Sequence, residues 1–453
     1  MKTRRLAKSL LMLLLLSVAS PYFAFGGEYT LIDLGTLGGP ESTARGINDN
    51  RQVTGISHVT ETVRHAYVWD EVNGMRDLGT LGGTDSGGIA INNFGKVGGW
   101  SDFDGNEPSH AFFHDGTTMH DLGTLGGDYS IVFAMNDNDQ LVGRASLDEG
   151  MYHAFLYEND VMHDLGTLGG TNSRGFGINE HGQVVGDSTL LANVGQHAFI
   201  WDQSNGMKSL GTLGGEISGA FAINNLGQVT GRSQYSSTTY DFHVFLWDET
   251  NGMQDLVGLD GGGTGYAIND KTQITGDSDG RAFVWDRVNG MRDLCVVTNC
   301  TDKGWTDLRI GRSINNHGDI VGEGIIDGVN HAFLALAPDK IVVEIDVLPK
   351  KDVNKINLNS KGSIQVVILS TDYFHAYNEV EPASVRFGPA DAVAIRYKIK
   401  DTNRDSLPDM VFYFKIRETG VECGDSEATL SGETYEGAAF EGTDTIVTTG
   451  CGE

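Results

Sequence analysis

The chain is poor in basic residues, has no long apolar run after its first residues and carries no recognisable catalytic motif. Lys and Arg number 32 against 61 Asp and Glu, so the formal net charge is −29. A charge of this sign argues against nucleic acid as a partner. After residue 26 no stretch approaches the roughly 20 apolar residues of a membrane-spanning helix, so we expect no membrane span.

The catalytic motifs that are missing cover several large enzyme classes. The sequence has no nucleophile elbow, HExxH motif, Walker loop or sialidase-type Asp box. The stretch CVVTNC has the wrong spacing for a zinc knuckle. We therefore expect a protein that is not an enzyme.

The first 26 residues have the pattern of a secretory signal peptide. Lys2, Arg4, Arg5 and Lys8 precede an apolar run from Leu10 to Leu16, and small residues follow near Ala24. This segment is too short to span a membrane, and its removal leaves 28 basic residues against 61 acidic ones. We expect a secreted, periplasmic or cell-surface protein whose acidic surface attracts cations such as Ca²⁺, although acidity is also common among secreted proteins.

Only four cysteines are present, and in an exported chain they predict disulfides. Three pairings are possible in principle. Proximity along the chain favours Cys295 with Cys300 and Cys423 with Cys451.

Glycine, with 62 residues, is abundant and is distributed through a repeat. DLGTLGG begins at Asp33, Asp77, Asp121 and Asp164, and an apolar residue followed by Asn recurs seven times at separations of 43 to 46 residues. Each unit continues with a GQVVG-like strand, a HAF-like strand and an MRDLG-like strand. Four short strands in about 44 residues indicate a β-propeller blade, with a parallel β-helix or open solenoid as the alternative.

The ends of the repeat region favour a closed ring. Residues 29–35 form an extra strand before the first unit, whereas the seventh unit stops after HAFLALAP and lacks its own fourth strand. We predict an all-β protein whose residues 27–338 form a seven-bladed propeller closed by the N-terminal strand. In that fold GTLGG is the joint between consecutive blades, and its glycines allow positive φ and close packing.

The period, LGTLGG, the IN turn and HAF resemble the extracellular HAF repeat family, named for its His-Ala-Phe repeats and known from bacterial secreted proteins. The resemblance covers residues 29–338 and implies an exported repeat protein without an assigned reaction. The sixth unit departs from the pattern with DLVGLDGGG and Arg281, and the seventh follows DLCVVTNC. The HAF histidines are expected to set strand register, because zinc needs four convergent ligands and histidines from different blades would lie far apart.

Function is expected where the repeats differ. The loops between second and third strands vary and share a face with the GTLGG crossings, which makes that face the predicted binding surface. Aromatic rings there are expected to be exposed and to stack on sugars, and acids to accept sugar hydroxyls or hold Ca²⁺. The residues assigned to these roles are Trp100, Phe103, Tyr235 and Tyr240, with Asp102, Asp104 and Glu107.

Two arginines interrupt an apolar position of the inner strand. Five units carry Ile or an aromatic residue there, but the first has Arg45 and the seventh has Arg312, in blades that are neighbours in a closed ring. The arginines either pair with local carboxylates, which is the favoured interpretation, or form an anion site near the axis.

Residues 339–453 predict a β-sandwich module. Alternating strands follow Pro338, and INLNSKG, VRFGP and CGDSEATLSGETYEG are similar to a module at the ends of bacterial and archaeal secreted proteins. DTNRDSLPD places Asp401, Asn403, Asp405 and Asp409 at alternate positions, as in an EF-hand loop, so Ca²⁺ is the one cofactor considered. Ser406 in place of glycine and Phe412 in place of an acid depart from that motif, and an acidic turn is the alternative.

These features together predict an exported, monomeric binding or adhesion protein. The expected partner is a polysaccharide, or else a protein of the envelope or the extracellular space. The alternatives are a carbohydrate-active hydrolase or lyase that uses the same face, which rests on analogy of fold alone, and a purely structural surface spacer.

Overall fold

The computed structural model describes residues 29–103, 108–147, 150–238, 240–256, 258–259, 261–287, 289–338, 340–349, 351, 353–371, 374–435 and 437–451. These residues are almost entirely in strands and turns, and each of the two α-helices among them is four residues long. No helix in these ranges is long and apolar enough to cross a bilayer. The predicted signal peptide, residues 1–26, lies outside them.

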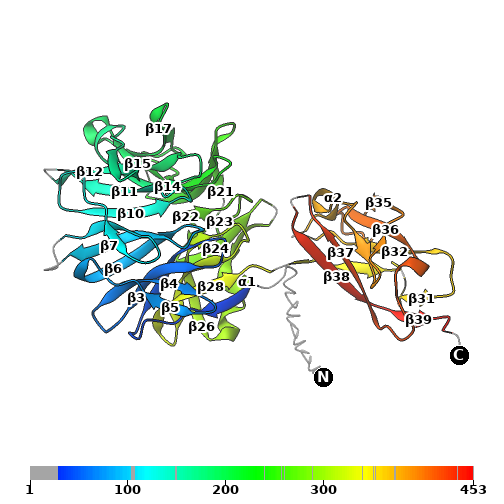
Figure 1. Ribbon diagram of the computed structural model, residues 1–453. Coiled ribbons are helices and arrows are strands. Elements are labelled where there is room, and N and C mark those ends of the chain that lie inside the picture. Colours follow the sequence, from blue (N-terminus) through cyan, green and yellow to red (C-terminus); the bar gives the residue numbers. More distant parts are fainter. Residues whose placement is uncertain are drawn as a thin grey trace, which may run out of the picture.

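Each repeat unit folds into one antiparallel sheet, as the sequence predicts (Figure 1). The first three sheets are β2 (Ser42–Ile47), β3 (Val53–His58), β4 (Arg64–Asp70) and β5 (Gly74–Asp77); β6 (Gly82–Ile91), β7 (Val97–Phe103), β8 (His110–His114) and β9 (Met119–Asp121); and β10 (Ser130–Met135), β11 (Leu141–Ser146), β12 (Tyr152–Glu158) and β13 (Val161–Asp164).

The next three sheets have the same order. They are β14 (Gly169–Ile178), β15 (Val184–Leu190), β16 (Gln196–Asp202) and β17 (Gly206–Gly211), with a 3-10 turn, η2 (Leu191–Asn193), after β15; β18 (Ser218–Ile223), β19 (Val229–Gln234), β20 (Phe242–Asp248) and β21 (Gly252–Leu256); and β22 (Gly263–Ile268), β23 (Ile274–Ser278), β24 (Arg281–Asp286) and β25 (Gly290–Asp293).

The seventh sheet draws its outer strand from the other end of the repeat region. It contains β26 (Trp305–Ile314), β27 (Ile320–Ile326) and β28 (Val329–Leu336), and β1 (Thr30–Asp33) pairs antiparallel with β28. The seven inner strands all end at one central pocket, so the sheets surround a common axis. The fold of this region is a β-propeller, and the sheets are numbered 1 to 7 in chain order below.

An aromatic ring and a glycine fix the middle of each sheet. The ring is the phenylalanine of HAF in six sheets and Tyr67 in sheet 1; it is fully buried and lies opposite the last glycine of the GQVVG-like strand, as Phe155 does opposite Gly143. A Cβ on Gly143 would collide with the carbonyl oxygen of Ile131 and would lie 2.9 Å from the Phe155 ring. The two residues recur together because the ring fills the space that the missing side chain leaves.

The HAF histidine and DLGTLGG form one hydrogen-bonded joint. His65 Nδ1 contacts Asp77 at 2.8 Å, and the Asp77 carboxylate accepts the Gly79 N–H at 2.7 Å, where φ is +71°. Ser86, on the next inner strand, donates to the Gly79 carbonyl at 2.6 Å and accepts the Ala66 N–H at 2.9 Å. The joint therefore ties the third and fourth strands of one sheet to the first strand of the next.

Sheet 7 is entered through a helical segment that the repeat does not predict. Asp293 caps α1 (Leu294–Val297) by accepting the Cys295 N–H, and a 3-10 turn, η3 (Cys300–Lys303), follows. The Cys295–Cys300 disulfide closes this segment. The predicted disulfides are confirmed here and at Cys423–Cys451.

The residues after Pro338 form two main sheets around one apolar core that includes Phe387, Phe412, Phe414 and Phe440. One sheet is β29 (Ile341–Val342), β38 (Ala439–Thr445), β37 (Glu427–Glu433), β33 (Arg386–Phe387) and β34 (Ala392–Val393), and the other is β30 (Ile345–Val347), β32 (Ser363–Ile368), β36 (Asp409–Lys415) and β35 (Arg396–Lys400). The smaller elements are β31 (Lys355–Asn357), β39 (Val447–Thr449), α2 (Ala376–Glu379) and η4 (Ile416–Glu418).

Candidate functional site

The antiparallel order of the strands gives the propeller two different faces. The IN turns and the turns before the fourth strands lie on one face, which we call the turn face. The loops between second and third strands lie on the opposite face with the GTLGG crossings, and we call this the loop face. The loop face collects the segments that differ most between repeats, so it is the candidate binding surface.

Sheet 5 carries an exposed group of aromatic rings on the loop face. Tyr235 and Tyr240 lie in the loop between β19 and β20 and are 54% and 85% exposed. The Tyr235 ring stacks on His243 with centroids 4.8 Å apart and an interplanar angle of 13°. Tyr240 lies edge to face with Phe242 at 6.0 Å, and Phe242 packs on the Arg232 guanidinium at 4.9 Å. An exposed aromatic surface held on ordered neighbours is suited to an apolar sugar face.

The corresponding residues of sheet 2 are less accessible than predicted. Trp100 and Phe103 are partly buried rather than exposed, because β7 continues to Phe103 instead of ending at Gly99. The Trp100 indole packs close to Gly87, and Phe103 lies edge to face with His110 at 4.7 Å. Asp102 accepts a hydrogen bond from Ser109 Oγ at 2.7 Å. Asp104 and Glu107 lie outside the described residues.

A row of aromatic side chains lies along the inner strands at the predicted apolar position. Phe133, Phe176, Phe221 and Tyr266 contact one another in sequence with centroids 4.9 to 5.5 Å apart. Each belongs to a different sheet and is partly exposed, as is every other residue at this position. In each sheet the backbone register shifts at this residue. These residues therefore face the axis.

Arg45 and Arg312 occupy this position in sheets 1 and 7. Arg312 Nη2 donates to Glu323 Oε1 at 2.6 Å, and the Arg312 guanidinium lies 5.1 Å from the Tyr266 ring centre. Burial raises the pKa of Glu323, but the charges of Arg312 and Arg45 outweigh that effect and lower it. Arg312 is thus paired with a local carboxylate, as the favoured interpretation of the sequence expects. Arg45 forms no ion pair among the described residues, and its Nε atom is buried without a hydrogen-bond partner.

Further charged groups contact this row of aromatic residues. Arg174 makes two hydrogen bonds to Asp187, at 2.9 and 2.6 Å. Burial raises the pKa of Asp187 although Arg174 opposes the shift. Burial also raises the pKa of Asp277, which is hydrogen-bonded to Tyr266 and lies near Arg312 and Arg232. These groups of sheets 4 to 7 thus lie beside the aromatic row as neighbours of opposite charge.

The HAF histidines are held in structural pairs. His65, His110, His153, His243 and His331 each contact an aspartate of the outer strand at 2.8 to 3.0 Å, and His197 contacts Ser209. Their role in strand pairing agrees with the sequence interpretation. Within the described ranges no group of three or more His, Cys, Asp or Glu side chains is placed to hold a metal ion.

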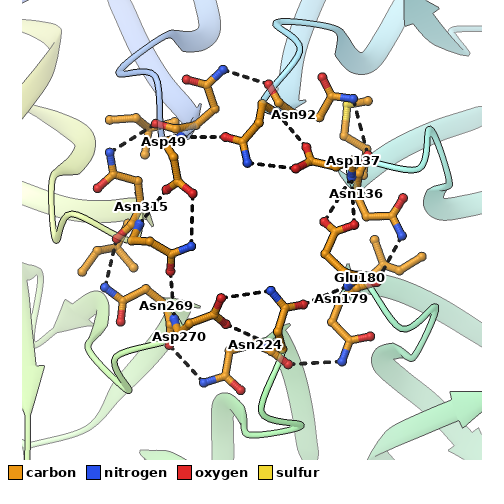
Figure 2. A pocket seen from close by; sticks show the side chains of 18 of the residues that line it. Asp49, Asn92, Asn136, Asp137, Asn179, Glu180, Asn224, Asn269, Asp270 and Asn315 are labelled. Carbon is orange, nitrogen blue, oxygen red and sulfur yellow. Dashed lines mark hydrogen bonds between the residues drawn. The ribbon is translucent and has the colours of Figure 1, made fainter. Parts of the chain in front are cut away.

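The turn face carries a polar ring that the sequence does not reveal (Figure 2). The Asn side chain of each IN turn donates to the backbone carbonyl of the Asn in the next sheet, from Asn48 to Asn92 and onward to Asn315, which donates to Asn48. The following residue, such as Asp49 or Asp137, accepts a backbone N–H of the preceding sheet in the same circular order. The ring surrounds a pocket of about 170 Å³.

The predicted calcium loop is divided in the structure. Asp401 accepts the N–H groups of Arg404 and Ser406, and Asn403 donates to Asp405 at 2.7 Å, so these exposed residues form one compact turn. Asp409 is fully buried and accepts the N–H groups of Ser370 and Thr402. Three of the four oxygen donors are thus grouped, while the fourth is engaged by the backbone; Ca²⁺ binding stays a prediction.

Comparison with solved structures finds β-propellers at low sequence identity. TolB from Acinetobacter baumannii matches with 10% identity and a TM-score of 0.38 over 67% of this chain and 65% of that chain, slightly less than two thirds of its length. The β-propeller domain of the Trilobed protease from Pyrococcus furiosus matches with 11% identity and a TM-score of 0.44 over 68% of this chain and 95% of that chain.

An oligogalacturonate lyase in complex with manganese matches with 12% identity and a TM-score of 0.45 over 69% of this chain and 96% of that chain. No protein-family model and no curated protein matches the chain. Because these TM-scores are all below 0.5, the description of fold and function rests on the residues of this chain.

Proposed function

We propose that this is an exported, non-enzymatic binding protein of the HAF repeat family that recognises polysaccharide with the loop face of its propeller. The observation that carries the proposal is the pair Tyr235 and Tyr240, whose exposed rings project from a loop supported by His243, Phe242 and Arg232. Large rings left in solvent cost solubility unless a partner covers them, and sugar rings present suitable apolar faces.

The proposal includes a ring of seven blades closed by β1 and followed by a β-sandwich. The pairing of β1 with β28 and the return of the polar ring from Asn315 to Asn48 support closure. A closed ring offers a rigid support on which variable loops hold fixed positions. Two disulfides suit an oxidising compartment, which supports export.

The test compares polysaccharide binding by the wild type and a Tyr235→Ala/Tyr240→Ala variant in affinity gels and in pull-downs on insoluble polysaccharides. Loss of both rings is expected to weaken binding at least about tenfold, which corresponds to roughly 1.4 kcal/mol. Phe94→Ala is the matched control, because Phe94 is an exposed aromatic residue, 70% accessible, on the turn face. Equal affinity in all three proteins would refute the assignment of the loop face.

A calcium arm tests the C-terminal module separately. Binding is measured with Ca²⁺ and with a chelator for the wild type and for Asp405→Ala. Dependence on Ca²⁺ that disappears in the variant would support an ion at the turn formed by Asp401, Asn403 and Asp405. Binding that is insensitive to chelator removes Ca²⁺ from the proposed function.

A further inference from the structure

Arg45 and Arg312 come together where the two ends of the repeat region meet. The inner strand β2 packs against β26 and β27 of sheet 7. The guanidinium charges of both arginines lower the pKa of the same carboxyl group, that of Glu323. At the same position the other sheets have Ile89 and four aromatic residues. Packing along the axis therefore does not require an arginine, and both arginines carry a desolvation cost that an apolar residue would avoid.

The charge in this cluster is not balanced. Glu323 Oε1 is bonded by Arg312 Nη2, with the side chains of both residues less than one fifth exposed. The Arg45 side chain has no hydrogen bond or ion pair to another described residue, and the Nε atoms of both arginines are buried without partners. Arg174, by contrast, is satisfied by two bonds to Asp187. Asp277 also lies near Arg312, but it is shared with Arg232. Three guanidinium groups, those of Arg45, Arg232 and Arg312, thus face the two carboxylates of Glu323 and Asp277, which leaves one positive charge in excess in a protein of net charge −29.

The cluster is directed toward the loop face. Glu323 pairs with Ile310, which precedes Arg312 by two residues and lies nearer the loop-face end of β26. Arg312 therefore extends from its backbone toward that face to reach Glu323. Arg45 remains partly accessible although its Nε is buried. Burial lowers the pKa of Arg45 and the neighbouring Arg312 lowers it further, whereas Glu323 raises it; a bound anion would act in the same direction as Glu323.

We propose that Arg45 and Arg312 bind a ligand carboxylate at the propeller axis. A guanidinium presents paired N–H donors that match the two oxygens of a carboxylate, and the Tyr266 ring beside Arg312 offers a surface for the carrier of that group. This assignment rests on the proposed function, which makes the carrier of the carboxylate a saccharide. We take uronic acids as the ligand class, because they are sugars that carry a carboxylate on the ring. The ligand class is therefore an acidic polysaccharide or oligosaccharide that contains uronate residues.

The experiment measures binding of uronate oligosaccharides, neutral oligosaccharides, sodium acetate and sodium sulfate by isothermal titration calorimetry on the full mature chain. The variants are Arg45→Leu, which places an apolar residue where sheet 2 has Ile89, and Arg45→Gln, which keeps hydrogen-bonding capacity without charge. Arg76→Ala removes one positive charge from the outer strand of the same sheet and is the control; Arg76 is exposed and forms an ion pair with Asp70. Circular dichroism and thermal unfolding check that each variant folds.

Uronate binding by the wild type and by Arg76→Ala, weakened at least about tenfold in both Arg45 variants, is the expected result. Unchanged uronate affinity in folded Arg45 variants would overturn the site. Sulfate that competes as well as uronate would overturn the assignment to a carboxylate. Binding of neutral polysaccharide alone would overturn this inference and leave the proposed function standing. Uronate affinity that is unchanged in the Tyr235→Ala/Tyr240→Ala variant would instead support the axial site and count against the loop face.

Discussion

Closure of the propeller can be tested with two identical substitutions at equivalent joints. Ser42 Oγ donates to the Gly35 carbonyl at 2.6 Å and accepts the Ala332 N–H at 3.0 Å, so it joins sheet 1 to sheet 7. Ser130 Oγ makes the same two bonds, at 2.6 and 2.8 Å, between sheets 3 and 2. Both serines and both alanines that donate to them are buried.

Ser42→Ala leaves the buried Ala332 N–H without a partner, which costs about 1 to 3 kcal/mol. Because the contacts of Ser130 are the same, Ser130→Ala is expected to cost as much. With a guanidinium m value of about 6 kcal/mol/M, a loss of about 2 kcal/mol shifts the unfolding midpoint by about 0.3 M.

The assay is guanidinium unfolding followed by tryptophan fluorescence. All six tryptophans lie between Trp69 and Trp305, so the signal reports the propeller and not the C-terminal module. Equal midpoint shifts in the two variants are the expected result for a closed ring. A normal midpoint in Ser42→Ala together with a reduced one in Ser130→Ala would show that sheets 1 and 7 do not join in solution, and would refute closure of the ring.

Three further predictions address the blades and the C-terminal module. Gly143→Ala should destabilise the propeller by several kcal/mol in the same assay, because its Cβ would meet the Ile131 carbonyl and the Phe155 ring, whereas Gly261→Ala, with open space around it, should have little effect. In an NMR titration the pKa of His243 should lie above 6.5, because the bonds and charges of Asp255 and Asp241 outweigh the lowering by burial, and that of His197 below 6.5, because of burial. Protonated His243 should then stabilise the fold below pH 6.5, and this contribution is lost as the pH rises through its raised pKa. The pH dependence of stability due to His197 should have the opposite sign, because its contribution is lost as the pH falls through its lowered pKa. Identical titration of the two histidines would contradict this prediction. Cys423→Ser should destabilise the C-terminal module by about 3.5 kcal/mol in calorimetry, because the bridge closes a separation of 28 residues, and an unchanged transition would show that the bridge does not constrain the unfolded chain.

The sequence was informative wherever the determining contacts recur in every unit. The period, the seven IN turns and the strand boundaries near GQVVG and HAF predicted the propeller because each blade repeats the same local pattern. The nearest-neighbour pairing of cysteines was correct because each pair lies within one short segment of its module. The partner of the HAF histidine was not identified, because the contact between His65 and Asp77 depends on the register of two strands.

The unsuccessful parts of the site prediction have a common physical origin. Trp100 and Phe103 follow the last glycine of the GQVVG-like strand, where the repeat pattern predicts a loop, but β7 extends through both residues and they are partly buried. The same extension is shorter in β19, which ends at Gln234, so Tyr235 is exposed. Strand length depends on pairing with the neighbouring strand and not on the residues alone. The polar ring of the turn face was missed because Asn and Asp after an apolar residue are ordinary turn residues until seven such turns converge.

Polysaccharide recognition by the loop face can be measured by binding of the mature protein to a broad array of glycans and polysaccharides. The wild type and Tyr235→Ala/Tyr240→Ala are applied side by side. We expect selective binding by the wild type, with uronate-containing glycans among those bound, and weaker binding by the variant. The absence of wild-type binding to any glycan would contradict polysaccharide recognition and would favour a structural spacer or a protein partner.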